Sequence, residues 1–485
     1  MAQAGEGGMD DFAFITGDAL TEEFGEKLLD CLKSLTVAFR SPDFRASAKE
    51  DVLKALKTLL EKSFASMKNL DGEVEETSMC LQVAVECFRS LRNACIQCYN
   101  NQCRLRELGF VETTTGILIT VQKCKYEESD SLCNVLHCGI QFLGNLAVQN
   151  QSCKDDIWEH GFPPLFLALL DSSDQKTVAY TCMALHTCLN EDKVEQMTQE
   201  QDSFAVAQKV LELCRTQPEL DWTILIVTEH FLKSQTLIEM MLSTMSPQER
   251  STLLELISAH LGEGREESEE CGILPATAEF LAGSFKDSCK SVLLLDSGDS
   301  SDDEEAVIVI RLLDILCEMS SGLKVFRSLQ DHPDLLETAI VLLKEVHLLG
   351  REGKNVFSSA QNFTDMGTGT GGASSHPIVS FKAHLVRLIG NLCHQNATNQ
   401  NKVRELDGIS LILDNCSLDS NNPFICQWAV FAIRNILDNN MENQQVIQSL
   451  KRQGVADDSA LRDMGFRLEE RDGNLLLRPC KKDPK

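Results

Sequence analysis

A helical motif with an Asn near its end recurs along this chain and constrains the fold more than any other feature. The apolar helices of four copies run from Phe88, Gln141, Arg387 and Phe431 to Asn93, Asn145, Asn391 and Asn435. An Asn-Gln pair follows each helix, at Asn101-Gln102, Asn150-Gln151, Asn399-Gln400 and Asn443-Gln444. The first two copies are 52 residues apart and the last two 44, which are periods typical of repeats of two or three helices.

Apolar residues recur at helical spacing in most of the remaining chain as well. Phe381, Leu385 and Leu388 follow one another by steps of four and three, and strand-like alternation is nearly absent. The order of helix, Asn, Asn-Gln, short helix and Gly resembles the armadillo repeat, so we expect an all-α, armadillo/HEAT-like α-solenoid. One exception closes the chain: Asp472-Gly473 lies between two short runs within residues 466–478 and predicts a small C-terminal β-hairpin.

The charge of the 485-residue chain excludes some classes of partner. It has 45 Lys and Arg against 73 Asp and Glu, which gives a formal net charge of −28. Such a surface repels phosphate backbones, so we expect no nucleic-acid binding, and it favours basic segments of partner proteins. Uninterrupted apolar stretches, such as residues 306–310 (AVIVI), fall far short of the roughly 20 residues that a spanning helix needs, so we expect no membrane insertion.

The 20 cysteines do not predict a disulfide scaffold. The N-terminal residues MAQAGEGGMDDFAF lack the basic and apolar regions of a secretory signal, so we expect a cytoplasmic protein with reduced thiols. Most cysteines would then act as small apolar residues on helix faces. Cys95-x-x-Cys98 lacks the second pair that a closed zinc site needs, and His137-Cys138 has no paired ligand spacing, so we expect no metal site.

Two segments interrupt the helical pattern and set the expected boundaries. Residues 296–305 (DSGDSSDDEE) form an acidic run that we expect to be a solvated loop, and residues 357–376 are rich in Gly, Ser and Thr. The expected organisation is a disordered N-terminus at 1–19, an N-terminal helical-repeat segment at 20–290, an acidic linker at 291–305, a C-terminal armadillo-like segment at 306–455 with a flexible loop at 357–376, and a tail at 456–485 with the hairpin.

The four motif residues Asn93, Asn145, Asn391 and Asn435 are the candidate partner-binding residues of a concave face. In armadillo proteins that bind extended peptides, a ladder of Asn amides pairs with the peptide backbone, since an amide offers both a donor and an acceptor. The alternative is that each Asn closes a helix or packs between repeats. Nuclear-import armadillo proteins also carry a Trp one turn before each Asn; the residues there are Arg89, Gln141, Arg387 and Phe431, which argues against a localisation-signal receptor.

No constellation in the sequence predicts catalysis. Residues 367–372 (GTGTGG) fit the pattern GxGxxG, but no strand precedes them and no βαβ unit surrounds them, so they predict a flexible loop. The sequence also lacks a P-loop, a GxSxG elbow, an HExxH motif and the kinase signature set. We therefore expect no enzymatic activity, no catalytic residue and no cofactor.

Ser300 and Ser301 are candidate phosphorylation sites. Each has an acidic residue three positions later, Asp303 and Glu304, which suits an acidophilic kinase. Phosphorylation would add about −1.5 to −2 charges at each site. The alternative is an acidic linker that is never modified, because such short motifs are unspecific.

Longer stretches point to a narrower family. FRSLRNACIQC, GIQFLGNLA, EEAVIVIRLLDILCEM, FKAHLVRLIGNLCHQN and QWAVFAIRN, in this order, resemble the ataxin-10 family over roughly residues 79–478. The resemblance is densest at residues 381–437.

The resemblance implies a non-catalytic scaffold for protein partners. The family is associated with neuron survival, neurite outgrowth, cytokinesis and the centrosome or ciliary base. It implies O-GlcNAc transferase, a G-protein β subunit and mitotic kinases as partners, together with self-association into a homo-oligomer. It also implies perinuclear, midbody and basal-body locations besides the cytoplasm. The alternative function is an armadillo-type regulator that changes the activity of a bound enzyme or small GTPase, whereas a scaffold would leave that activity unchanged.

Overall fold

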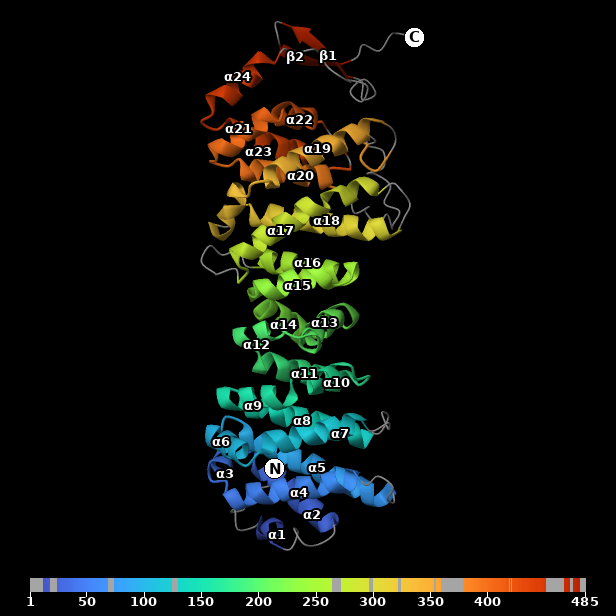
Figure 1. Ribbon diagram of the computed structural model, residues 1–485, viewed down its shortest axis with the longest axis vertical. Helices are drawn as coiled ribbons and strands as arrows, with labels where there is room; N and C mark the ends of the chain where they lie inside the picture. Colours follow the sequence, from blue (N-terminus) through green and yellow to red (C-terminus); the bar gives the residue numbers. More distant parts are fainter. Residues whose placement is uncertain are drawn as a thin grey trace.

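The computed structural model shows an elongated column of helices that follow one another in chain order (Figure 1). The structure describes residues 12–17, 24–68, 74–123, 130–263, 272–295, 300–321, 324–352, 355–358, 378–417, 419, 421–450, 466–471 and 474–479.

The helices are grouped here by their position along the column (Figure 1). The first half contains α1 (Ala13–Thr16), α2 (Glu26–Ala38), α3 (Pro42–Ala46), α4 (Glu50–Lys68), α5 (Val74–Cys95), α6 (Tyr99–Glu107), α7 (Phe110–Lys123), α8 (Asp130–Ala147), α9 (Gln151–Gly161), α10 (Pro164–Leu170), α11 (Gln175–Cys188), α12 (Glu191–Gln196), α13 (Gln201–Thr216) and α14 (Asp221–Glu229). The second half contains η3 (Phe231–Lys233), α15 (Gln235–Thr244), α16 (Pro247–Glu263), α17 (Pro275–Ser288), η4 (Cys289–Leu294), α18 (Ser300–Met319), η5 (Lys324–Asp331), α19 (Leu335–Glu352), α20 (Phe381–Leu392), α21 (Ala397–Glu405), α22 (Gly408–Asp414), α23 (Ile425–Leu437) and α24 (Met441–Ser449).

Helices in equivalent positions of successive repeats pack on one another. One row runs through α2, α5, α8, α11, α14, α16, α18, α20 and α23, each in contact with the next, and a second row runs through α4, α7, α10, α13 and α16. A single repeat cannot bury its apolar face, so these rows share one hydrophobic core that extends from Phe12 to Ile436. The predicted all-α, armadillo-like solenoid is confirmed.

The contact between α20 and α23 shows how the sequence pattern produces this packing. Leu385, Leu388 and Ile389 are fully buried, and each such side chain contributes about 1.5–3 kcal/mol by leaving water. Gly390 allows the backbones to approach closely, because a Cβ atom there would lie 2.9 Å from the Cα of Ala432. The helical spacing that the sequence shows at residues 381–392 therefore becomes a tight seam between two repeats.

The expectation of disorder over residues 1–19 is wrong for residues 12–17. Phe12 and Ile15 are buried, and the ring of Phe12 packs edge-on against that of Phe44 with 5.7 Å between centroids. Short helix α1 contacts α2 and α4, so its apolar side chains cover the end of the column that would otherwise face water. Residues 1–11 and 18–19 lie outside the described residues.

The expectation of a loop through the acidic run is wrong for residues 300–305, which form the first turns of α18. Gln248 Nε2 on α16 donates to Glu304 Oε1 over 2.5 Å, and Arg250 pairs with Glu305. The expected linker at 291–305 also begins within η4, which packs against α18, so the solenoid continues across it. Residues 296–299 lie outside the described residues.

Two further expectations fall largely outside the described residues. Phe357, the first residue of the expected flexible loop, is buried, which corrects the loop boundary there, while residues 359–376 are not described. At the end of the chain, strands β1 (Phe466–Arg471) and β2 (Asn474–Pro479) lie antiparallel, with Phe466 opposite Pro479. Their turn, Asp472-Gly473, is not described, and the predicted C-terminal hairpin stays a prediction.

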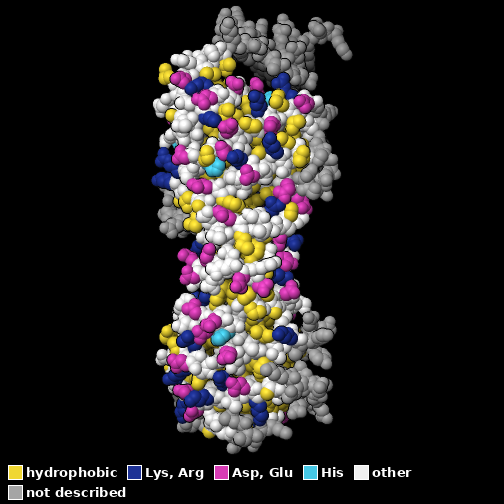
Figure 2. Space-filling model, in the orientation of Figure 1, with side chains coloured by type: hydrophobic (Ala, Val, Ile, Leu, Met, Phe, Trp, Pro, Cys, Tyr) yellow, Lys and Arg dark blue, Asp and Glu magenta, His cyan; other side chains and the backbone are white. Residues whose placement is uncertain are grey.

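The surface of the column mixes charges of both signs. Figure 2 shows acidic and basic side chains interspersed along one face, with apolar side chains between them. Over the described residues, no helix combines the length and the apolar character required to cross a membrane.

Candidate functional site

The four motif Asn residues lie in the last turns of α5, α8, α20 and α23. Each helix is followed by a residue with left-handed backbone, and these are Gln97, Gln149, Gln395 and Asn439, with φ of 51°, 58°, 53° and 54°. A residue in this conformation ends a helix sharply. The chain therefore turns at the same point in each of these repeats and presents each Asn at the same place on the seam.

Each motif Asn connects its helix to the preceding one in the row. The amide nitrogens of Asn93, Asn145, Asn391 and Asn435 donate to the carbonyl oxygens of Thr36, Arg92, Cys317 and Gly390 over 2.9, 3.1, 3.1 and 2.9 Å. Asn145 is half-buried and the other three are buried. The donors of the predicted ladder are thus used within the protein.

The amide oxygens of the same residues remain available. Within the described part of the chain none of these four oxygens accepts a hydrogen bond, and none is a fully buried unsatisfied atom. An amide in this state can still accept a hydrogen bond from the backbone N–H of a partner. The role of these residues in partner binding stays a prediction, and the geometry limits it to the acceptor.

A second set of amides, which sequence reasoning did not single out, reinforces the seams. Gln102 Nε2 donates to Asn145 O over 3.0 Å, and Gln400 Nε2 donates to Asn435 O over 2.9 Å. Asn443 Nδ2 likewise donates to the carbonyl oxygen of Gln400 over 2.9 Å. The sequence could have indicated these contacts, since each residue belongs to an Asn-Gln pair of the repeat.

The sequence analysis placed Asn150-Gln151 in line with the Asn-Gln pairs of the other three repeats, and this alignment was wrong by three residues. Asn150 is the N-cap of α9, where its side chain accepts from the backbone N–H of Cys153 over 3.2 Å. Asn396 and Asn440 cap α21 and α24 in the same way. In the second copy, Cys153 therefore occupies the place that Asn101 has in the first.

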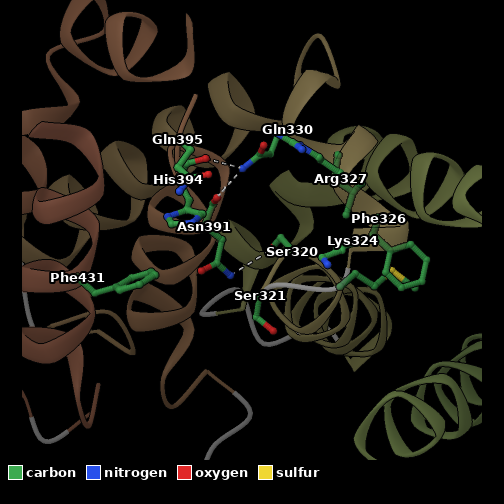
Figure 3. A pocket seen from close by; sticks show the side chains of 12 residues that line it. Ser320, Ser321, Lys324, Phe326, Arg327, Gln330, Asn391, His394, Gln395 and Phe431 are labelled. Carbon is green, nitrogen blue, oxygen red and sulfur yellow. Dashed lines mark hydrogen bonds between the residues drawn. The ribbon is translucent and has the colours of Figure 1, made fainter. Parts of the chain in front are cut away.

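An open pocket of about 450 Å³ lies beside Asn391, where α18, η5, α20 and α23 meet (Figure 3). The residues that give it its chemistry are Ser320, Ser321, Lys324, Arg327, His394 and Phe431. We call this pocket the Asn391 groove. Figure 3 shows the amide oxygen of Asn391 on the side that faces Phe431, while its nitrogen points to Ser320.

The Asn391 groove is locally basic in an acidic protein. Lys324 and Arg327 are exposed, and neither has a hydrogen bond or ion pair to another described residue. One wall is fixed by Gln330, whose Nε2 donates to the carbonyl oxygens of Asn391 and His394 over 3.2 and 3.0 Å. The groove therefore combines two cations without partners among the described residues, the aromatic ring of Phe431 and the amide oxygen of Asn391, which resembles a backbone acceptor.

Curated relatives match this chain over nearly its whole length. It is 42% identical over 453 residues to ataxin-10 of Xenopus tropicalis, covering 93% of this chain and 92% of that protein. It is 40% identical over 460 residues to ataxin-10 of Bos taurus, covering 94% of this chain and 95% of that protein. The chain belongs to the ataxin-10 family.

Two family models match parts of this ataxin-10 family chain. The spinocerebellar ataxia type 10 protein domain matches residues 381–478, which include Asn391 and Asn435, and the BEM4 N-terminal domain matches residues 15–200. A designed armadillo repeat protein in complex with the peptide (KR)4 covers 79% of this chain at 13% identity, with a TM-score of 0.19. So low a score adds nothing to the helical packing described above.

The phosphorylation candidates of this ataxin-10 family member lie at the start of α18. Ser300 and Ser301 are the first two residues of that helix, and their side chains lie outside the described residues. Their modification stays a prediction.

The cysteines of this ataxin-10 family member behave as apolar residues. Of the 17 described cysteines 11 are buried, and burial raises the pKa of the Cys153, Cys182 and Cys188 thiols to about 12. Cys95 and Cys98 belong to no group of three metal-ligating side chains within the described part. The GxGxxG stretch at residues 367–372 is not described.

Proposed function

We propose that this ataxin-10 family chain is a non-catalytic scaffold that binds protein partners at the Asn391 groove. The proposal rests on one observation: Lys324 and Arg327, which have no ion-pair partner among the described residues, lie beside an amide oxygen that also has no described partner. An extended acidic segment of a partner matches this chemistry, because its carboxylates pair with the cations and a backbone N–H reaches the Asn391 oxygen. The basic segments that the net charge favours are repelled at this point.

Membership of the ataxin-10 family supports a more specific proposal about partners and cellular roles. By resemblance the partners are O-GlcNAc transferase, a G-protein β subunit and mitotic kinases, and the chain acts in neurite outgrowth, neuron survival, cytokinesis and at the centrosome or ciliary base. We extend the same proposal to self-association and to perinuclear and midbody locations.

The test compares groove and control variants against purified partners. Lys324→Glu together with Arg327→Glu reverses the local charge of the groove. Lys123→Glu together with Lys176→Glu makes the same change in net charge at exposed lysines on α7 and α11, nearer the other end of the column (Figure 1). Calorimetric titration with the G-protein β subunit and with O-GlcNAc transferase should show at least about tenfold weaker binding for the groove variant alone, which is the loss of roughly 1.4 kcal/mol.

The same titrations separate the alternatives. Affinity that falls equally in both variants would mean nonspecific attraction, and affinity unchanged in both would place the partner elsewhere on the column. Turnover of the bound enzyme decides between scaffold and regulator: a scaffold leaves the rate of O-GlcNAc transferase unchanged at saturating concentrations.

A further inference from the structure

Two histidines lie at the ends of successive repeats in the middle of the column, one residue nearer the following N-cap than the motif Asn of the outer repeats. His186 lies in the last turn of α11, four residues before the N-cap Asn190, and His230 follows α14, four residues before the N-cap Ser234. They are 44 residues apart, the same period that separates Asn391 from Asn435. Stacked repeats bring equivalent positions together, so this period places the two imidazoles side by side.

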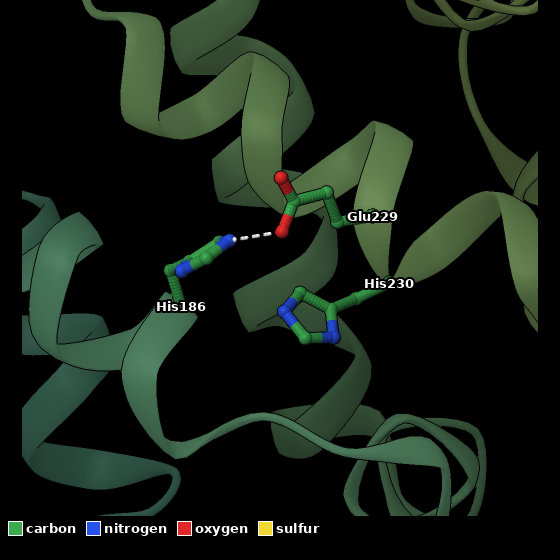
Figure 4. Close-up of side chains that lie close together, drawn as sticks. All are labelled: His186, Glu229 and His230. Carbon is green, nitrogen blue, oxygen red and sulfur yellow. Dashed lines mark hydrogen bonds and ion pairs between the residues drawn. The ribbon is translucent and has the colours of Figure 1, made fainter. Parts of the chain in front are cut away.

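The imidazoles meet a carboxylate at this seam (Figure 4). The rings of His186 and His230 lie edge to face with 5.0 Å between centroids, and His186 Nε2 is 2.9 Å from Glu229 Oε2. One ligand atom from each of the three residues lies within 4.8 Å of the other two. Figure 4 shows the side chains converging from the end of α11 and from the end of α14.

One nitrogen of the half-buried His230 imidazole is left without a protein partner among the described residues. His230 Nε2 is buried and has no hydrogen bond within the described residues. This nitrogen is therefore left for a ligand, and it lies beside the ligand atoms of His186 and Glu229.

We propose that His186, Glu229 and His230 bind one Zn²⁺ ion. Two imidazole nitrogens and a carboxylate oxygen are a zinc ligand set, whereas Mg²⁺ and Ca²⁺ prefer oxygen ligands throughout. Glu229 and His230 line an open cavity of about 460 Å³ together with Asp192 and Lys233, which leaves room for a water molecule as the fourth ligand. Ligands about 2.1 Å from zinc lie about 3.4 Å from one another, so the site contracts on binding. The Glu229 side chain is 52% exposed and is able to move inward.

The ion would join two successive repeats. His186 belongs to α11, while Glu229 and His230 belong to the end of α14, so one ion would hold together a seam that carries no motif Asn. The site is separate from the Asn391 groove, and its test does not depend on the proposed function.

The test is calorimetric titration of Zn²⁺ into the full chain, reduced and freed of metal, at pH 7.5. The wild-type chain should bind one equivalent that His186→Gln and His230→Gln each weaken by more than about tenfold, since even outer-shell partners of a metal commonly matter that much. His137→Gln is the matched control, because His137 makes the same kind of contact, 2.6 Å to Asp174 at the α8–α11 seam, without a second histidine. Circular dichroism establishes that each variant retains its helices.

Binding of Co²⁺ gives a second readout that distinguishes histidine from cysteine ligation. The visible spectrum of the wild-type chain should be that of nitrogen and oxygen ligands, without the charge-transfer band that thiolates produce. Zn²⁺ bound equally by wild type and both histidine variants would overturn the proposal, as would the absence of binding or a thiolate band.

Discussion

The outer repeats and the middle of the column close their seams with different side chains. In the outer repeats, Asn93, Asn391 and Asn435 donate to carbonyl oxygens of the preceding repeat, and a second set of amides adds further bonds. In the middle, His186 and His230 lie near the ends of their repeats, one residue nearer the following N-cap than the motif Asn, and His230 Nε2 has no partner among the described residues. The same stack of helices therefore has two kinds of seam. In the outer seams the amide donors of the motif Asn residues are hydrogen-bonded, and in the middle seam His230 Nε2 has no partner among the described residues.

This difference shows which interactions are needed to stack the repeats. Apolar burial is continuous through both regions, since the core extends without interruption from Phe12 to Ile436. The amide contacts are an addition that fixes the register of neighbouring repeats, because a side-chain amide reaches only one carbonyl at the correct distance. Where they are missing, the core and the contact between His186 and Glu229 join the repeats, and His230 Nε2 is left without a partner among the described residues.

The largest effect should come from removing a fully buried amide in an outer seam. Asn443 Nδ2 donates to the carbonyl oxygens of Gln400 and Ile436, each over 2.9 Å, and its Oδ1 accepts from Arg404 over 2.6 Å. Asn443→Ala removes three hydrogen bonds from a buried site and should cost about 3 kcal/mol. Hydrogen exchange should show faster opening of α21–α24, while Gln448→Ala, an exposed change on the same helix, should leave exchange unaltered.

The next largest effect comes from comparing a substitution at an outer seam with one at the middle seam. Asn391→Ala removes a donor bonded to Cys317 O and Ser320 Oγ and should cost about 1–2 kcal/mol. His230→Leu, measured with a chelator present, removes a nitrogen that has no described partner and should cost less than about 0.5 kcal/mol. Equal destabilisation of the two variants in urea would show that the seams do not differ as described.

Replacing the buried hydroxyl of Thr277, on α17 in the middle of the column, should increase the stability of the protein. Thr277 on α17 is fully buried, and its Oγ1 has no partner within the described part of the structure. Thr277→Val keeps the shape and removes the unsatisfied group, so it should stabilise α15–α18 by about 1 kcal/mol. Thermal unfolding checks this prediction; a lower melting temperature would indicate that a water molecule satisfies the hydroxyl.

The smallest effect concerns acid stability at the α8–α11 seam. Burial raises the pKa of Asp174, but hydrogen bonds from His137 and Thr177 outweigh it, so the pKa is lowered overall. A lowered pKa contributes stability that is present above the unfolded-state value near 3.9 and disappears as the pH falls through the folded-state value. Asp174→Asn, which still caps α11, should therefore cost less than about 1 kcal/mol at pH 7 and should flatten the loss of stability below about pH 4. An unchanged acid profile would contradict this assignment.

The fold could be predicted from the sequence to a large extent, and the site only in part. The steps of three and four residues at Phe381, Leu385 and Leu388 identify a helix because they repeat every turn, and the 44-residue period identifies a stack. The residues of the acidic run that join α18 were predicted wrongly. Their helical state depends on partners on α16, and Arg250 lies 55 residues before Glu305.

The sequence alone determined the helical repeats, the seam positions of the Asn residues and the membership of a family. Those features are local or periodic, and a helix or a repeat is readable from its own residues. Only the tertiary structure decided which atom of each Asn is occupied, that Lys324 and Arg327 lie beside Asn391 without an ion-pair partner in the described part of the chain, and that the rings of His186 and His230 are in contact. These facts depend on how repeats tens of residues apart stack, because a hydrogen bond or a metal site is set by distances of a few ångströms between side chains that the sequence places far apart.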